Sequence, residues 1–406
     1  MSHRNAMFIL VGIIVGALVG ILTGWVFGPS MLAVKWVGDL FLNALKMLIV
    51  PLIVAAVVSG VASLGDVRKL GRLGGVTLSY YVITCALAVL VGLIVVNVIQ
   101  PGAGVNAAAT AGAEPALPEE AGISDILLSL VDPNIVAAAA EGKFLPLILF
   151  SILLAAALTT VGRRGEHVIE FFNGINDAMM TLVTWLMYLA PIGIAALIAA
   201  RLGQAGGGAA FLKELQAVGA YVLTVLIGLA LHFLVLLVIL YVVAGRRLDY
   251  LAGLARALLT AFGTASSTAT LPLTMECARE SGIGERAVRF VLPLGSTINM
   301  NGTALYEAVA AMFIAQSYGL DLGLGQQAIV LVTASLAAVG AAGIPEAGLV
   351  TMVIVLNAVG LPLEGIAMLL AVDWFLDRCR TAINVWGDAV GAAVIQRLAP
   401  DISGDE

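Results

Sequence analysis

The sequence contains little charge for its length. Charged residues make up 11% of the 406 positions, whereas soluble domains contain about 25%. Hydrophobic residues account for 61%, and the mean hydropathy is +1.06. The formal net charge of −6 is too small and too scattered to predict a nucleic-acid partner or a polybasic lipid contact. The composition instead predicts a protein embedded among membrane lipids.

Cysteine is also scarce. Cys85, Cys277 and Cys379 lie in apolar segments without the spacing of a metal site, so no disulfide framework is expected. The first apolar run, 7–27, is long enough to cross a membrane and lacks a clear Ala-x-Ala cleavage site. We interpret it as a retained first helix, with a cleaved leader as the alternative.

Eight apolar runs reach the length of a membrane crossing, about 20 residues. They lie near 6–28, 36–62, 74–100, 124–161, 168–200, 213–244, 284–318 and 363–396. The fourth is long enough to predict several shorter helices. Basic residues follow the second, fourth and sixth runs, at Arg68, Lys69, Arg72, Arg163, Arg164, Arg246 and Arg247. The connection 101–123 contains acidic residues and no basic one. Because basic connections stay in the cytoplasm, the sequence predicts an inner-membrane protein with both termini cytoplasmic.

Two further apolar segments, 250–281 and 324–358, are interrupted in the middle. Residues 261–272 and 338–348 place small residues and a proline at these interruptions, which predicts two re-entrant helical hairpins. Turn-forming residues at 299–303 predict an unwound stretch in the seventh run, with carbonyl groups free to bind a cation. The alternative is three kinked helices packed through small residues.

The segment 371–388 carries charge inside an apolar run. Its polar positions recur every three or four residues, at Asp373, Asp377, Arg380, Asn384 and Asp388. At about 100° per residue they fall within roughly 80° of one helix face. Ionisable groups at membrane depth are costly, so they face a protein interior or a watery cavity and pair with other groups. This stripe is the candidate functional site.

Four motifs accompany the stripe. They are Ser-Ser-Thr-Ala-Thr-Leu-Pro at 266–272, the segment 292–307, Gly-Ala-Ala-Gly-Ile-Pro at 340–345, and Asp-Trp-Phe-Leu-Asp-Arg-Cys-Arg-Thr at 373–381 followed by Asn-Val-Trp-Gly-Asp at 384–388. With these motifs the chain resembles the glutamate transporter family, the dicarboxylate/amino acid:cation symporters. The resemblance extends over almost the whole chain and is strongest from 260 to 396.

The resemblance implies an all-α fold with eight transmembrane helices and two re-entrant hairpins. It also implies a homotrimer in which a scaffold holds a mobile transport domain that moves like an elevator. The scaffold would comprise 1–73 and 101–212, the transport domain 74–100 and 213–398, and a cytoplasmic tail 399–406.

The resemblance also assigns substrate-binding residues. Asp377 would bind the substrate amino group and Arg380 its side-chain carboxylate, since a planar guanidinium suits a carboxylate. Neutral exchangers lack the arginine and carriers of four-carbon diacids lack the aspartate, so the pair implies an acidic amino acid. The remaining substrate-binding residues would be Ser266, Ser267, Thr303, Thr381, Asn384 and the backbone of Gly343. Ala265 together with Arg378 resembles the arrangement of animal members, in which a second arginine lies on the eighth helix.

Two sodium sites are implied by the same resemblance, and no cofactor besides the coupling ions. The first would use Gly295, Asn299, Asn384 and Asp388. The second would use backbone near Thr297, Ala338, Val339 and Ala341. Both offer the hard oxygen ligands that suit sodium.

A third sodium site departs from the family pattern. It would contain Tyr81, Thr84 and Asn299, but Cys85 stands in place of a serine and Asn301 in place of an aspartate. Because the only charge of a buried cation site is lost, we predict that this site is absent or weakened. Glu307 occupies the proton-carrying position of animal members. A buried carboxyl group can be neutral or charged during a cycle, and the alternative is a permanently protonated structural residue.

Three other residues require an interpretation. Glu346 replaces a small residue at the tip of the second hairpin, and we interpret it as harmless in the external vestibule, with altered hairpin opening as the alternative. Trp386 points away from the stripe and is interpreted as packing. His232, alone in an apolar run, is interpreted as an interhelical polar group with a partner.

The sequence therefore predicts a secondary symporter, not an enzyme, that imports L-glutamate or L-aspartate with sodium, protons or both. One alternative is a purely proton-coupled carrier of acidic amino acids or dicarboxylates. Two others are an intramembrane enzyme that uses Asp373 and Asp377 as acid and base, and an ion channel built from broken helices.

Overall fold

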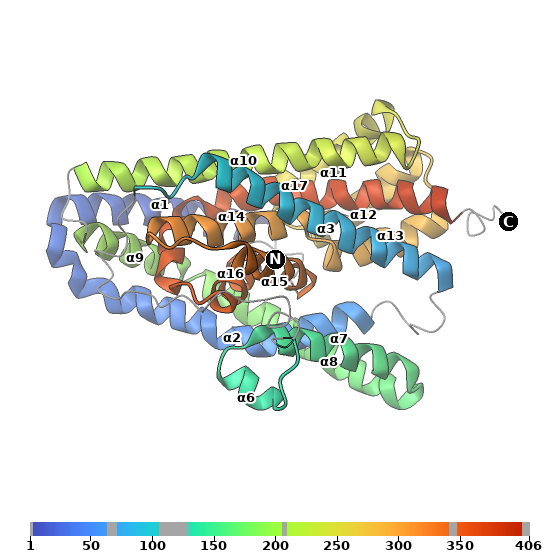
Figure 1. The fold of residues 1–406 in the computed structure, drawn as a ribbon, viewed down its shortest axis with the longest axis horizontal. Helices are drawn as coiled ribbons and strands as arrows, with labels where there is room; N and C mark the ends of the chain where they lie inside the picture. Colours follow the sequence, from blue (N-terminus) through green and yellow to red (C-terminus); the bar gives the residue numbers. More distant parts are fainter. Residues whose placement is uncertain are drawn as a thin grey trace.

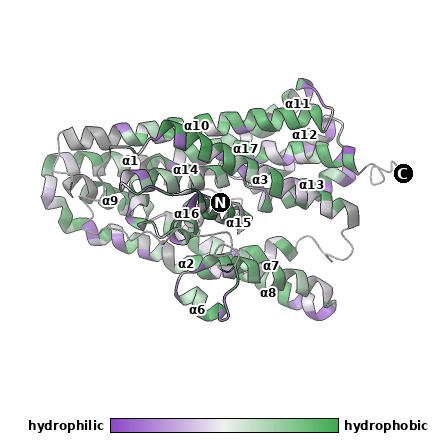
Figure 2. Ribbon diagram, viewed as in Figure 1, coloured by the Kyte–Doolittle hydropathy of each residue, from purple (hydrophilic) through white to green (hydrophobic). Residues whose placement is uncertain are grey.

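The computed structural model describes residues 3–62, 71–104, 128, 130–204, 209–340 and 347–399. These residues form helices with short connections, and none of them forms a strand. Figure 1 shows most long helices running roughly along the longest axis of the molecule. Hydrophobic residues cover most of their length, and hydrophilic residues gather at several helix ends (Figure 2). The all-α prediction is confirmed.

Several predicted crossings correspond to single helices. These are α1 (His3–Phe27), α2 (Lys35–Ala62), α3 (Gly71–Ile99), α10 (Ala209–Val242) and α17 (Ile366–Leu398), with the short 3-10 helices η1 (Gly28–Val34) and η2 (Leu363–Gly365). Within the described residues, three helical stretches are long and apolar enough to cross a membrane, at Val11–Phe41, Leu73–Ile99 and Gln216–Val242. A bent pair at Arg163–Leu186 and Ala190–Ala200 adds a fourth. The chain is a multi-pass membrane protein, and the number of eight crossings stays a prediction.

Other predicted crossings are divided. The fourth contains α6 (Ile135–Ala140) and α7 (Phe144–Thr160), which confirms its prediction as shorter helices. The fifth contains α8 (Arg163–Met187) and α9 (Ala190–Gln204), bent by 56°. The seventh contains α13 (Glu285–Ile298) and α14 (Asn301–Ser317). Asn299 and Met300 between them have non-helical backbone angles, so the predicted unwound stretch is present at 299–300, whereas 301–303 begin α14.

The first interrupted segment forms two packed helices, α11 (Leu248–Thr264) and α12 (Ser267–Glu280). Ala265 ends α11 in the left-handed region, at φ 50°, which a small side chain tolerates better than a branched one. Ser266 begins α12, because its Oγ accepts a hydrogen bond from the Ala269 amide at 3.1 Å. This N-cap satisfies an amide that the first helical turn leaves unpaired.

The second interrupted segment forms α15 (Leu324–Gly340) and α16 (Ala347–Ala358), which pack against each other. Their connection, 341–346, lies outside the described residues. The predicted roles of Ala341, Gly343 and Glu346 therefore also lie outside them.

Two sets of helices pack mainly among themselves. In the first, α1 packs on α9, and α2 packs on α7, α8 and α9. A Cβ on Gly16 would lie 2.2 Å from the Pro191 carbonyl oxygen, so glycine permits this close approach of α1 and α9. In the second, α3 packs on α10 and α14, and α17 packs on α10, α11, α13 and α14. Helix α14 lies at the centre, with all its residues except Gln316 buried. The division into scaffold and transport domain stays a prediction.

Candidate functional site

The charged stripe of α17 faces the interior of the protein. Asp373, Asp377, Arg380, Asn384 and Asp388 are each exposed by 4% or less. The helical periodicity of the sequence therefore located this face correctly. Buried charges are stable only when they are paired and hydrogen-bonded, so the partners of each residue define the site.

Arg380 is paired with two carboxylates of its own helix. Its Nη1 donates to Asp373 Oδ1 at 2.7 Å, and its Nε donates to Asp377 Oδ1 at 2.9 Å. Asp373 lies seven residues before Arg380 and Asp377 three, which places both on the same helix face. The two carboxylates carry more negative charge than the guanidinium neutralises, so the group can accept a further cation.

Two neighbouring helices enclose the guanidinium. The Tyr306 ring of α14 lies beneath Arg380 Cζ, 4.3 Å from the ring centroid, in a cation–π contact. On α16, a Cβ on Gly348 would lie 2.8 Å from Arg380 Cζ. The sequence analysis missed both residues. The sequence could have indicated Tyr306, because it follows Thr303 by three residues and so lies on the same helix face. Nothing in the sequence indicated that Gly348 lies against Arg380.

Asn384 joins α17 to the unwound stretch of α13 and α14. Its Oδ1 accepts a hydrogen bond from the Gly302 amide at 2.7 Å. Its Nδ2 lies 3.2 Å from Thr303 Oγ1 and 3.4 Å from Met300 Sδ. Asn384 thus acts as an N-terminal cap from another helix, since α14 has no side-chain cap of its own. This contact brings Thr303 to the stripe.

Asp388 lies against the C-terminal turn of α13. Asn299 Nδ2 donates to Asp388 Oδ1 at 2.9 Å, and a Cβ on Gly295 would lie 2.3 Å from that oxygen. Asn299 Oδ1 is buried and has no hydrogen-bond partner among the described residues. A carboxylate, a buried amide oxygen and the nearby carbonyl groups form an oxygen-rich set that suits a hard cation. Three of the residues assigned to the first sodium site are therefore together, and the fourth, Asn384, lies one helical turn before Asp388.

The second assigned sodium site is brought together in part. Helix α13, which contains Thr297, packs against α15, which contains Ala338 and Val339. Thr297 Oγ1 donates to the Leu294 carbonyl at 2.9 Å, and Ala338 is fully buried.

The third assigned site has a neutral amide where the family pattern has a carboxylate. Asn301 is fully buried, and neither its Oδ1 nor its Nδ2 has a partner in the part of the chain that the structure describes. Tyr81 Oη donates to the Val291 carbonyl at 2.6 Å, and Thr84 Oγ1 donates to the Tyr80 carbonyl at 2.8 Å. Cys85 is buried on the same helix.

The tip of the first hairpin contacts α13 and α17. Ser267 Oγ donates to the Ser296 carbonyl of α13 at 3.1 Å, and Ser266 serves as the N-cap of α12. Arg378 Nη1 donates to the Phe262 carbonyl at 3.1 Å and to the Gly263 carbonyl. Arg378 therefore binds the C-terminal end of α11, where unpaired carbonyls attract a cation. Thr381 Oγ1 donates to the Asp377 carbonyl at 2.7 Å.

Glu307 is fully buried on α14, one turn after Thr303. Thr351 of α16 donates its hydroxyl to Glu307 Oε1. Glu307 Oε2 has no hydrogen-bond partner among the residues that the structure describes. The carboxyl group thus links α14 to the second helix of the second hairpin.

The predictions for two isolated residues, Trp386 and His232, have different outcomes. Trp386 is fully buried and stacks on Phe233, with ring centroids 5.3 Å apart, so its interpretation as packing is confirmed. The interpretation of His232 is wrong, because both ring nitrogens are buried without a partner in the described ranges. Its neighbours on α10 are buried aliphatic residues such as Leu229 and Leu236, which offer no hydrogen bond.

Comparison with known protein families identifies the family of the chain. Residues 7–398 match the sodium:dicarboxylate symporter family. The chain belongs to this family. It is 39% identical to the mouse protein named excitatory amino acid transporter 3, across 89% of this chain and 78% of the relative. It is 40% identical to bovine neutral amino acid transporter B(0), across 91% and 74%, and 37% identical to excitatory amino acid transporter 1 of Ambystoma tigrinum, across 89% and 76%.

Membership of the sodium:dicarboxylate symporter family confirms the resemblance noted from the motifs. It confirms a transporter in place of an enzyme, so Asp373 and Asp377 are not an acid–base pair for intramembrane catalysis. Sodium as a coupling ion fits the family. The roles assigned to individual residues stay predictions.

The buried charge group yields a test of stability. We expect Arg380→Met to lower the apparent melting temperature, because it leaves two buried carboxylates uncompensated, a loss of about 3–5 kcal/mol. Asp373→Asn should lower stability in the native background and raise it in the Arg380→Met background. Thermal unfolding of the purified protein in detergent, with all four combinations, measures this reversal of sign. Equal, additive effects of Asp373→Asn in both backgrounds would show that the residues are not coupled.

Proposed function

We propose that this symporter imports acidic amino acids, L-glutamate or L-aspartate, and that a cation gradient drives the import. The observation that carries the proposal is the buried guanidinium of Arg380, which already binds two carboxylates. The relatives named excitatory amino acid transporters support this substrate class. The chain is equally similar to a relative named as a neutral amino acid transporter, so overall identity does not decide the substrate. The buried guanidinium of Arg380 favours an acidic substrate.

The contacts of Arg380 support a binding sequence. The substrate ammonium group attracts Asp377, which then releases Nε of Arg380. The freed side of the guanidinium accepts the side-chain carboxylate of the substrate in a bidentate arrangement. Tyr306 keeps the guanidinium plane in place during this exchange, while Asp373 continues to bind Nη1. An acidic amino acid provides an ammonium group for Asp377 and a side-chain carboxylate for Arg380. A neutral amino acid provides no side-chain carboxylate, so it leaves the freed side of Arg380 without a partner.

The remaining substrate groups would meet the ends of the broken helices. The N-terminus of α12, with Ser266 and Ser267, offers amide and hydroxyl donors for the α-carboxylate. Thr303, Thr381 and Asn384 border the stripe on α14 and α17. The backbone of Gly343 would close over the substrate from the second hairpin.

An elevator movement within a homotrimer is part of the proposal. Its support is the separate packing of α1, α2, α7, α8 and α9 on one side and of α3, α10–α14 and α17 on the other. All assigned substrate residues belong to the second set or to its hairpins. The second set would move as the transport domain, and the first would remain fixed as the scaffold. Both termini would lie on the cytoplasmic side of the inner membrane.

Coupling to sodium and to protons is proposed from two separate groups. Asp388 with Gly295 and Asn299 would bind sodium next to Asn384, so that one residue of α17 touches both the ion site and the substrate site. Glu307 would carry the proton, and its hydrogen bond from Thr351 connects its protonation to the second hairpin. A purely proton-coupled carrier is the second candidate, favoured by the neutral amide of Asn301, which has no partner among the described residues.

Arg380→Ala tests the substrate assignment. We expect it to abolish L-glutamate and L-aspartate uptake into proteoliposomes, because the substrate carboxylate loses its only buried cation at the stripe. Arg256→Ala is the matched control, since Arg256 is exposed and pairs with Glu280 on the surface of the first hairpin; it should retain uptake. Glutamate transport by the Arg380→Ala protein would contradict the proposal.

Sodium and pH dependence separate the two coupling hypotheses. Aspartate binding to the purified protein should weaken at least tenfold when sodium is replaced by choline, if the Asp388 group binds sodium. Uptake should also fall as the external pH rises, because Glu307 must be protonated before inward movement, and Glu307→Gln should remove this dependence. Calorimetry and flux assays measure both. Affinity that is independent of sodium across the pH series would exclude sodium coupling.

Asn301→Asp tests the third sodium site. Restoring the carboxylate, together with Cys85→Ser, should steepen the dependence of aspartate affinity on sodium concentration, because one more ion binds with the substrate. The Hill coefficient for sodium in a binding titration measures the change. Asn301→Ala is the control, since it removes the amide without adding charge. An unchanged Hill coefficient would show that other residues prevent the third ion from binding.

A further inference from the structure

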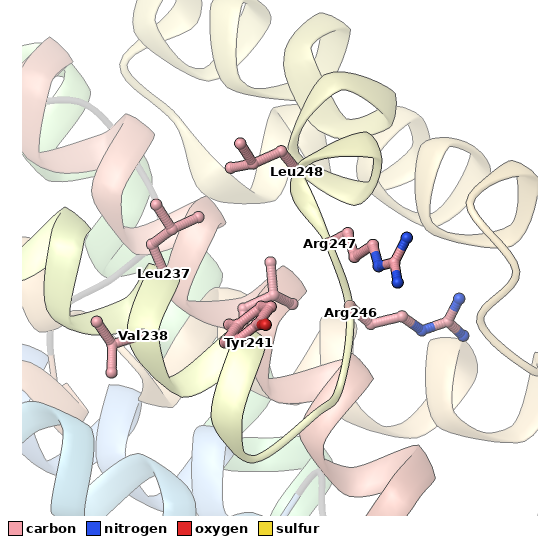
Figure 3. Close-up of a pocket in the computed structure, with 7 residues that line it drawn as sticks. Leu237, Val238, Tyr241, Arg246, Arg247 and Leu248 are labelled. Carbon is pink, nitrogen blue, oxygen red and sulfur yellow. The ribbon is translucent and has the colours of Figure 1, made fainter.

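A pocket lies where α10 ends and α11 begins, away from the charged stripe. Its volume is about 250 Å³, and its lining includes Leu237, Val238, Tyr241, Arg246, Arg247 and Leu248. In Figure 3 the apolar side chains lie along α10 and at the start of α11, and both arginine side chains extend together from the turn between the helices. The lining of the pocket is therefore apolar, and the two arginines form a cationic rim whose guanidinium groups extend away from the apolar side chains (Figure 3).

The apolar part faces outward. Val238, Tyr241 and Leu248 are exposed by 60% or more. Val238 and Tyr241 lie near the end of Gln216–Val242, one of the stretches long and apolar enough to cross a membrane, and Leu248 follows its end. Such side chains are stable when acyl chains cover them. The pocket is consequently a depression in the lipid-facing surface, at the end of a crossing.

The cationic rim is assembled from two parts of the chain. Arg246 donates to the Gly282 carbonyl at 2.7 Å, which fixes its position. The Arg397 guanidinium, from the end of α17, lies so close to Gly245 that a Cβ there would be 1.9 Å from Nη1. Three arginines of the chain thus gather at one turn. The sequence alone did not predict this cluster of three arginines, because Arg397 is distant in sequence from Arg246 and Arg247.

Arg247 has spare hydrogen-bonding capacity. It is exposed, and no hydrogen bond or ion pair joins its side chain to another described residue. It is also the N-cap residue of α11, and its side chain makes no cap hydrogen bond there. Asp249 lies close by, and its Oδ1 accepts the Tyr250 amide at 3.0 Å, which directs this carboxylate to its own helix.

The position of the rim relative to the membrane decides the ligand. The connection with Arg246 and Arg247 follows a crossing and is cytoplasmic by the positive-inside rule. Arginines at this level meet the anionic headgroups of the inner leaflet. A phosphate at the rim would accept hydrogen bonds from Arg247 and the α11 amides, and an attached acyl chain would continue into the apolar depression.

We infer that this pocket is a binding site for an anionic phospholipid of the inner leaflet, with its phosphate on Arg247 and one acyl chain against Val238, Tyr241 and Leu248. Because α11 runs from this pocket to Ala265 and Ser266, the bound lipid anchors the first hairpin at the end opposite to its tip. The site is independent of the substrate site and of the coupling ion.

Native mass spectrometry of the detergent-purified protein tests the inference, with phosphatidylglycerol and phosphatidylcholine of the same acyl chains as probes. We expect several-fold tighter binding of phosphatidylglycerol, and a loss of about fivefold with Arg247→Gln, the magnitude for one arginine at a membrane surface. Arg164→Gln is the matched control, because Arg164 is an exposed arginine at another predicted cytoplasmic connection; it should leave the affinity unchanged. Leu248→Ser should weaken binding of both lipids.

Each contrary result overturns the inference. Equal binding of the two lipids means nonselective lipid contact, and equal losses with Arg247→Gln and Arg164→Gln mean general surface attraction. Glycerol 3-phosphate that displaces phosphatidylglycerol at comparable concentration means a site for a soluble phosphate and no acyl-chain contact. Arg247 and Leu248 are exposed, so the variants should fold, and an unchanged melting temperature without added lipid verifies this.

Discussion

The structure depends on one buried charge, the guanidinium of Arg380. A cation with 1% exposure in the middle of a membrane-embedded protein is stable only with close anionic partners. Asp373 and Asp377 supply them from the same helix, and Tyr306 supplies its ring face from α14. Gly348 of α16 leaves room for the group. Three helices are thus held in register around one side chain, which is the one buried cation among the five residues of the stripe.

The broken helices place backbone polar groups around this charge. Helices α13 and α14 separate at Asn299 and Met300, and Asn384 caps the new helix end from α17. The tip of the first hairpin, at Ala265 and Ser266, lies beside α17. There Arg378 donates hydrogen bonds to the last carbonyls of α11. In an apolar surrounding, unpaired backbone groups are tolerated only where they are bound from elsewhere or line a cavity. Side-chain amides and arginines of α17 satisfy this requirement and link each break to the stripe.

Sequence reasoning located features that depend on local periodicity. The stripe on α17 follows from spacings of three and four residues, and the breaks at 265–266 and 299–300 follow from small and turn-forming residues. It did not find Tyr306 as the partner of Arg380 or Thr351 as the partner of Glu307, because those contacts join helices distant in sequence. It was wrong about His232, since the residues that face a side chain across a helix interface are not specified by its own helix.

The sequence by itself determined the membrane class, the helical content, the charged face of α17 and the family, because composition, helical period and short motifs are properties of neighbouring residues. Only the tertiary structure decided which charges pair. It brought Arg380 onto Tyr306, left the Asn301 amide without a partner within the described residues, and gathered Arg246, Arg247 and Arg397 at the end of α10. These arrangements come from packing between helices, and the free energy of a buried or clustered charge depends on neighbours that local sequence does not specify.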